Sequence, residues 1–209
     1  MFKKLSTITL FLVFVAFSSQ AQKKKATKAA KKTEAAIATE AVAKPAASSR
    51  SIAIEAPVAK SINWVTMKEA MAKNETNRKK FLIDFYTDWC GWCKKMDAST
   101  YQDPKVIAVI NKYFHAVKFN AEKEEPLNYR GKEYKIENQG TRGTHSLVFE
   151  LLGNRVGYPS TSFLNSDLSN IQSVAGYIQS DEMEMILRYI GEEKNKSMPF
   201  EEFKKSQGK

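Results

Sequence analysis

Apolar and polar residues follow two different periods along this chain, and the changes of period mark the predicted elements. The run 81–86 is apolar on both faces except for Asp84, as expected of a strand covered by helices on both sides. Three further strands are predicted at 116–120, 161–164 and 171–175. The turn 165–167 joins the last two as a hairpin.

Helical spacing of apolar residues predicts the elements between these strands. Four helices are predicted. The first begins with a capping box at 66–69 and ends at about 74, and the second begins at 91 and ends at Asp103-Pro104. The third continues from Pro104 to about 113, and the fourth covers 180–191. Asp103 can cap the renewed helix and Pro104 can open it. Residues 122–155 also contain a small hairpin at 129–134 and a helix at 144–152.

The chain has two cysteines, Cys90 and Cys93, directly after the first buried strand. A strand that continues into a helix at this point places Cys90 at the helix N-terminus, where free N–H groups and the helix dipole favour a thiolate. Cys93 then lies on the same helix face, within bonding reach. The spacing therefore predicts a two-electron redox couple.

Other uses of a Cys-x-x-Cys motif place demands on the surrounding sequence. A structural zinc ion needs four ligands, and the two histidines, His115 and His145, are isolated in the sequence. Haem attachment needs a histidine at position 94, which is Lys94. A permanent structural disulfide stays open, although so short a loop constrains the unfolded chain little. We expect no metal and no other cofactor.

The N-terminal 21 residues have the pattern of a secretory signal. Lys3 and Lys4 precede an apolar run at 8–17, and small residues lead to a cleavage site near Ala21. A periplasmic or secreted protein is predicted. An uncleaved membrane anchor is the alternative, but the run is shorter than the roughly 20 residues that span a bilayer.

Residues 22–60 form a Lys/Ala-rich linker without aromatic residues, and no core can form there. Residues 1–60 carry 11 Lys or Arg and three Glu, so a net +8 of the total +10 belongs to them. The linker is either a solvated tether or a segment attracted to an anionic surface. Nucleic acid is not an expected partner, because the rest of the chain is almost neutral. Residues 61–195 are predicted as the folded domain and 196–209 as a C-terminal tail.

Over residues 62–192 the chain resembles the thioredoxin-like superfamily. The sequence around the cysteines and at Asp103-Pro104 is similar to periplasmic thioredoxin-like domains related to the C-terminal domain of transmembrane disulfide reductases, and Gly176 matches a family glycine. The resemblance implies an α/β thioredoxin fold, with a central mixed β-sheet flanked by helices. It also implies that the segment 122–155 is an insertion before the cis-proline.

The resemblance implies that Asp84 is a buried carboxylate beneath the cysteines and that Lys118 is its partner. Burial in an apolar strand raises the pKa of a carboxyl group, so Asp84 is a candidate base for the Cys93 thiol. The alternative is a hydrogen bond to Lys118 that only stabilises the core.

The resemblance also implies substrate contacts. A cis bond between Tyr158 and Pro159 would leave the Tyr158 backbone free to pair with an extended substrate chain, whereas the alternative is an ordinary turn. Trp89 and Trp92 bracket the thiols and would form an apolar docking rim, and Gly91 between the thiols is a further candidate for substrate binding. Core packing is the alternative for the tryptophans, and more so for Trp89 than for Trp92.

We therefore predict a secreted thiol-disulfide oxidoreductase with Cys90 as nucleophile and Cys93 as resolving thiol. Its partners are protein thiols and disulfides, and a separate membrane protein supplies its electrons. We expect a monomer. The dipeptide Gly91-Trp92 leaves the direction of electron flow open, and the lack of histidine there favours a reductant. The alternatives are an oxidase or isomerase, and a non-catalytic binding module.

Overall fold

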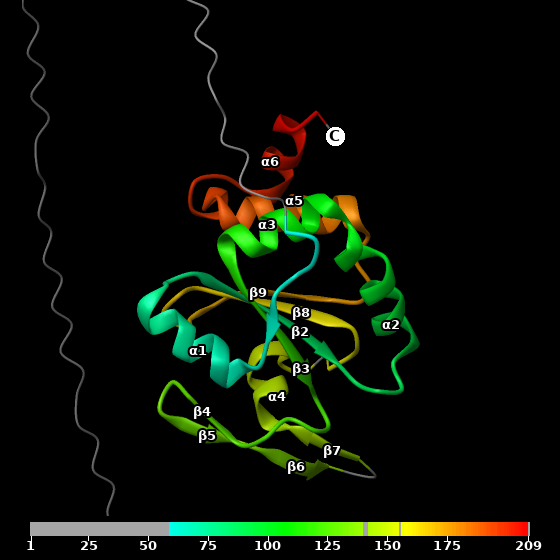
Figure 1. Ribbon diagram of the computed structural model, residues 1–209, viewed down its shortest axis with the longest axis vertical. Helices are drawn as coiled ribbons and strands as arrows, with labels where there is room; N and C mark the ends of the chain where they lie inside the picture. Colours follow the sequence, from blue (N-terminus) through cyan, green and yellow to red (C-terminus); the bar gives the residue numbers. More distant parts are fainter. Residues whose placement is uncertain (1–58, 140–141, 155, 209) are drawn as a thin grey trace, which may run out of the picture. The chain divides into compact units, whose positions relative to one another are not determined.

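The computed structural model describes residues 59–139, 142–154 and 156–208 (Figure 1). The predicted signal and all but the last two residues of the predicted linker lie outside the described residues. No helix among those described combines the length and hydropathy needed to cross a bilayer.

A five-stranded mixed sheet forms the centre of the domain, in the order β1-β3-β2-β8-β9. Its strands are β1 (Trp64–Val65), β2 (Lys80–Tyr86), β3 (Phe114–Asn120), β8 (Ser160–Leu164) and β9 (Asn170–Ala175). The first three are parallel, whereas β8 runs antiparallel to both β2 and β9. The register pairs Asp84 of β2 with Lys118 of β3. Because β8 runs antiparallel to β2, the start of β8 lies beside the end of β2.

Helices cover both faces of this sheet. They are α1 (Met67–Thr76), α2 (Gly91–Ala98), α3 (Pro104–Tyr113), α4 (Ser146–Leu152) and α5 (Ser180–Gly191), with a short 3-10 turn η1 (Thr100–Gln102) between α2 and α3. Figure 1 shows α3 and α5 on one side of the sheet and α1 and α4 on the other.

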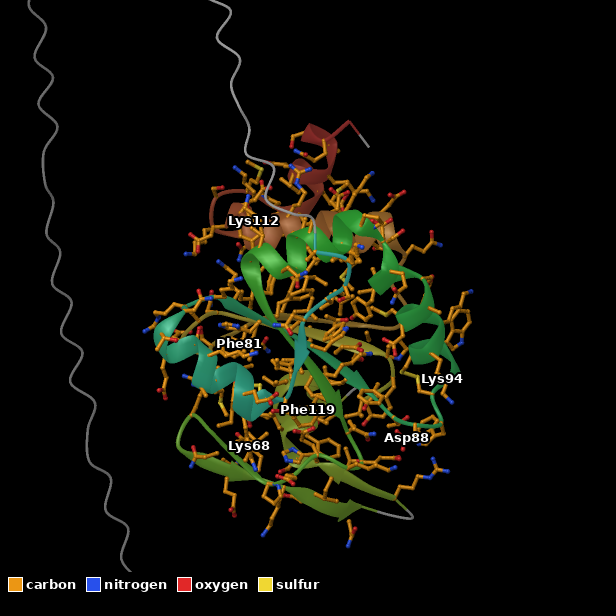
Figure 2. The ribbon with its side chains drawn as sticks, viewed as in Figure 1. Lys68, Phe81, Asp88, Lys94, Lys112 and Phe119 are labelled. Carbon is orange, nitrogen blue, oxygen red and sulfur yellow. A yellow bond between two sulfur atoms is a disulfide. The ribbon has the colours of Figure 1, made fainter. Side chains whose placement is uncertain are left out.

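Side chains of β2 alternate between two apolar cores, because successive residues of a strand point to opposite faces. Phe81, Ile83 and Phe85 pack with α1 and α4, whereas Leu82 packs with α3 and α5. Phe119 of β3 lies in the same core as Phe81, and Figure 2 shows both residues near α1. The prediction of a strand buried on both faces is confirmed.

The N-terminal caps of two helices form where the sequence predicts them. Thr66 and Glu69 make a reciprocal capping box at the start of α1. Asp103 Oδ1 accepts the backbone N–H of Lys105 at 2.8 Å, and Pro104 is the first residue of α3. These contacts satisfy amide groups that a helix start leaves without partners.

Residues 122–155 contain more structure than the sequence indicates. The predicted hairpin is β4 (Leu127–Tyr129) with β5 (Lys132–Tyr134), and a second, unpredicted hairpin pairs β6 (Ile136–Gln139) with β7 (Arg142–His145). The helix predicted from 144 begins at Ser146, because residues 142–145 belong to β7. The backbone N–H of His145 donates to Ala121 O at 2.7 Å, which joins β7 to the residue that follows β3.

The C-terminal segment differs from the predicted tail. After η2 (Lys194–Lys196), residues Phe200–Ser206 form α6. Phe203 is 2% exposed, and its ring centroid lies 5.5 Å from that of Tyr189 in α5. The folded domain therefore continues past residue 195, because Phe200 and Phe203, three residues apart on α6, both pack against Tyr189.

Candidate active site

The two cysteines lie where β2 turns into α2. Cys90 is the N-cap residue of α2, and its Sγ accepts the backbone N–H of Cys93 at 3.1 Å. This position brings free N–H groups and the positive end of the helix dipole to Sγ. The sulfurs form a disulfide, and each cysteine is 3% exposed. Position in the helix, rather than exposure, therefore distinguishes Cys90 from Cys93.

A buried charged pair lies on the strands behind this turn. Lys118 Nζ donates to Asp84 Oδ2 at 2.6 Å, and the Asp84 side chain is 2% exposed. Burial raises the pKa of Asp84 above its ordinary value, although the Lys118 charge opposes this effect. A carboxyl group with a raised pKa is a stronger base than an ordinary carboxylate, so Asp84 is suited to accept a proton.

Asp97 of α2 joins the pair, although it is not among the site residues predicted from the sequence. Lys118 Nζ also donates to Asp97 Oδ1, and the Asp97 side chain is 44% exposed. Lys118 thus links a buried carboxyl group to one that reaches solvent. The spacing could have revealed this residue, because Asp97 lies four residues after Cys93 on the same helix face.

Tyr158 and Pro159 reach the site because β8 runs antiparallel to β2. The bond between them is cis, as the resemblance implies, and Pro159 O accepts the N–H of Gly176 at 2.8 Å. Gly176 has φ +93°, a conformation that favours glycine. The rings of Tyr158 and Trp89 are 6.2 Å apart. The cis-proline segment therefore borders the cysteine motif.

Both tryptophans of the motif face solvent, with exposed fractions of 56% for Trp89 and 57% for Trp92. The alternative of core packing is wrong for both. A Cβ atom at Gly91 would meet no atom within 4 Å, so the surface between them is open. Figure 2 shows Asp88 and Lys94 at the outer edge of the domain, before and after this turn.

Comparison with known families decides the relationship. A family profile described as a thioredoxin-like domain matches residues 67–191, more than half of the chain. The chain belongs to the thioredoxin-like family. Its mixed sheet flanked by helices is the thioredoxin fold, and the Cys90–Cys93 pair is the arrangement of a thiol-disulfide oxidoreductase.

Individual relatives cover smaller parts of this thioredoxin-like protein. The thiol:disulfide interchange protein DsbD of Photorhabdus laumondii is 39% identical over 44 residues, which are 21% of this chain and 7% of that protein. The chain therefore matches only a small part of that relative's length.

Solved structures with similar folds include a thioredoxin from Thermus thermophilus and the reduced C-terminal domain of DsbD from Neisseria meningitidis. The first is 16% identical with a TM-score of 0.47, covering 62% of this chain and 87% of that one. The second is 24% identical with a TM-score of 0.39, covering 58% of this chain and 90% of that one.

The insertion of this thioredoxin-like protein contributes to the site. Trp89 Nε1 donates to Glu122 Oε1 at 3.0 Å, and the Arg142 guanidinium carbon lies 5.2 Å from the Trp89 ring centroid. Arg142 comes from β7, one of the strands that the sequence pattern does not predict. The predicted position of the insertion near the cis-proline end is confirmed by these contacts.

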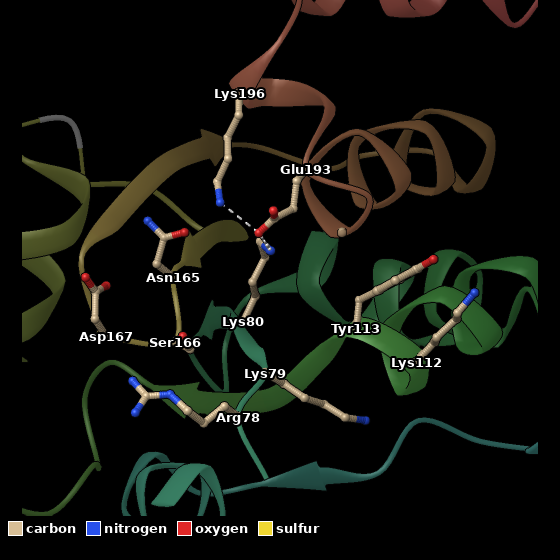
Figure 3. A pocket seen from close by; sticks show the side chains of 11 residues that line it. Arg78, Lys79, Lys80, Lys112, Tyr113, Asn165, Ser166, Asp167, Glu193 and Lys196 are labelled. Carbon is tan, nitrogen blue, oxygen red and sulfur yellow. Dashed lines mark hydrogen bonds and ion pairs between the residues drawn. The ribbon is translucent and has the colours of Figure 1, made fainter.

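A cavity of about 570 Å³ lies at the other end of β2, away from the cysteines (Figure 3). There Glu193 accepts hydrogen bonds from Lys80 and Lys196, each at 2.9 Å, and these lower the pKa of Glu193 to about 2. The arrangement is an ion-pair cluster that joins the start of β2 to the end of α5. It contains no group suited to redox chemistry.

Within the described ranges, no group of three or more His, Cys, Asp and Glu side chains could hold a metal ion. The expectation that the chain needs no cofactor stays a prediction.

Proposed function

We propose that this protein is exported and reduces disulfide bonds of other proteins by dithiol exchange through Cys90 and Cys93. The position of Cys90 at the N-cap of α2 carries the proposal, because it favours the thiolate that attacks a disulfide. The buried Asp84, on the strand that leads into this turn, supplies a base for the second step.

The first step is attack of the Cys90 thiolate on one sulfur of the substrate disulfide. The substrate S–S bond breaks, its other sulfur leaves as a thiolate that takes a proton from water, and a mixed disulfide with Cys90 forms. Cys93 then loses its proton to Asp84 and attacks Cys90 Sγ. The bond between Cys90 and the substrate sulfur breaks, this sulfur leaves as a thiolate that takes a proton from water, and the Cys90–Cys93 disulfide forms, so that two electrons have moved from the protein to the substrate.

The proton on Asp84 needs a route to solvent, and the ion-paired groups offer one. Lys118 contacts both Asp84 and the partly exposed Asp97. We propose that Lys118 keeps the Asp84 carboxyl group able to exchange its proton between cycles. The cis-Pro159 segment and the exposed Trp89 and Trp92 are proposed to hold the substrate chain beside the sulfurs.

A reductant must be reduced again after each cycle. We propose that a membrane protein with its own dithiol donates the electrons on the far side of the membrane. The signal pattern at 1–21 supports this location. The similarity to part of a protein named for thiol:disulfide interchange supports the exchange chemistry.

A trapping experiment tests the function. A Cys93→Ala variant should accumulate mixed disulfides through Cys90 with proteins of the same compartment, whereas a Cys90→Ala variant should accumulate far fewer. Equal trapping by both variants, or none, would favour the binding-module alternative. Equilibration of the native protein with glutathione separates a reductant from an oxidase or isomerase, since a reductant has the more negative potential.

A further inference from the structure

Two aromatic platforms flank the disulfide. In the part of the chain that the structure describes, Trp89 and Trp92 are the large hydrophobic side chains with high exposure. Trp92 packs against Tyr177 at 5.5 Å between ring centroids, and Lys95 Nζ lies 4.6 Å from the Trp92 centroid. Each tryptophan is thus held by neighbours and also has a cation over its ring.

Arg142 is the cation over Trp89, and it reaches this position from the β6–β7 hairpin. Its guanidinium carbon lies 5.2 Å from the ring centroid, and its Nη1 is 4.0 Å from Glu122 Oε1, a long contact. The Arg142 side chain is 61% exposed. The guanidinium therefore lies over the Trp89 ring in a largely exposed side chain, and its N–H donors remain accessible to a carboxylate.

The hairpin that carries Arg142 is anchored. His145, at the end of β7, is fully buried, with its ring centroid 5.1 Å from that of Phe119. The ladder of β6 with β7 pairs Gln139 with Arg142, so Arg142 begins the returning strand. Because Trp89 and Glu122 also contact Arg142, the guanidinium is held beside the edge where Tyr158 and the cis-proline lie.

The charges around the motif favour an acidic partner. The charged residues of the segment 88–95, together with those that contact it, are Lys94, Lys95, Lys123, Arg142, Asp88 and Glu122. Four cations against two carboxylates leave a net charge of +2. Both carboxylates already have partners, since Asp88 pairs with Lys123 and Glu122 accepts from Trp89.

We propose that Arg142 is a substrate-binding residue that recognises a carboxylate close to the reacting cysteine of an extended polypeptide. This inference rests on the proposed function and adds to it a preference among protein substrates. The partner is a protein segment with Asp or Glu beside its disulfide. Trp89 supports the guanidinium by a cation–π contact, and the substrate carboxylate accepts hydrogen bonds from its N–H groups.

Two matched peptides test this proposal. Each carries one cysteine as a mixed disulfide with a neutral thiol, flanked on both sides by Glu in one peptide and by Gln in the other. The rate of exchange with the reduced protein is measured for each. The Glu peptide should react about three- to five-fold faster, the size expected for one exposed charge pair. Added salt should reduce the ratio towards one.

Variants locate the effect. Arg142→Gln should remove most of the preference for the Glu peptide while its rate with the Gln peptide changes little. Arg130→Gln is the matched control, because Arg130 is an exposed arginine in the other hairpin of the same insertion. Thermal unfolding of each variant checks that the fold is intact. An unchanged ratio in Arg142→Gln, or no preference in the native protein, would overturn the proposal.

A neutral small disulfide, 2,2′-dithiodipyridine, separates this inference from the function on which it rests. If the native protein reacts with it faster than free cysteine does but shows no preference between peptides, only the role of Arg142 is wrong. If it reacts no faster than free cysteine, the proposed function itself fails.

Discussion

Replacing Asp84 by Asn removes the proposed base with almost no change of shape. Asp84 is buried, and its ion-pair partner Lys118 keeps a second partner in Asp97. The variant therefore leaves no unpaired buried cation. A general base contributes about 10²- to 10⁴-fold to a proton-transfer step. We expect the lower end, about 10²-fold, because the Lys118–Asp97 pair remains near the site.

The reaction with 2,2′-dithiodipyridine measures the two steps separately. Attack by Cys90 releases one pyridine-2-thione, and attack by Cys93 on the resulting mixed disulfide releases a second. In rapid-mixing absorbance, Asp84→Asn should slow the second phase about 10²-fold while leaving the first within about three-fold. Asp88→Asn is the matched control, since Asp88 is an exposed carboxylate close to Cys90.

Stability supplies an independent check with a defined sign. Burial raises the pKa of Asp84 from its ordinary value of 3.8, so the folded state holds this proton more tightly than the unfolded state. The native protein therefore loses stability as pH rises from about 3.8 through the folded pKa. Asn does not titrate. Relative to the native protein, the variant should gain stability over that window and keep the gain at higher pH.

Two results would refute the reasoning about Asp84. One is equal slowing of both phases, which would indicate a general disturbance of the site. The other is an unchanged second phase in a variant that unfolds cooperatively. A stability difference that does not vary with pH would show that the Asp84 carboxyl group titrates alike in the folded and unfolded states.

Three further predictions concern other parts of the chain. Alkylation of the reduced protein at varied pH should give Cys90 a pKa below the free-thiol value of about 8.5, with Cys93 less reactive; faster labelling of Cys93 would reverse the assigned roles. Deleting residues 22–60 behind the intact signal should leave turnover of a small disulfide and the melting temperature unchanged, and a large loss of turnover would contradict the domain boundary. Phe203→Ala should lower the free energy of unfolding by about 3–5 kcal/mol in chemical denaturation, because Phe203 is buried against α5; no change would support the predicted tail.

Much of the candidate site could be predicted because its residues are close in sequence. Cys90, Cys93 and the cap of α2 depend on contacts within a few residues, which spacing and helix geometry determine. Asp84 could be recognised because it is a charged residue in an apolar run. The partners of Trp89 could not be predicted in this way. Arg142 is 53 residues away from it in sequence, in a short polar hairpin with little strand signal.

Local pattern by itself determined the order of the main strands and helices and the redox motif, since these follow from residue periodicity and capping. Only the tertiary structure decided which distant residues meet the motif. Antiparallel pairing of β8 with β2 brings Pro159 to the cysteines, and the β6–β7 hairpin places Arg142 over Trp89. It also decided that both tryptophans stay exposed and that α6 packs on α5. Burial depends on how complete elements pack together, and no short segment contains that information.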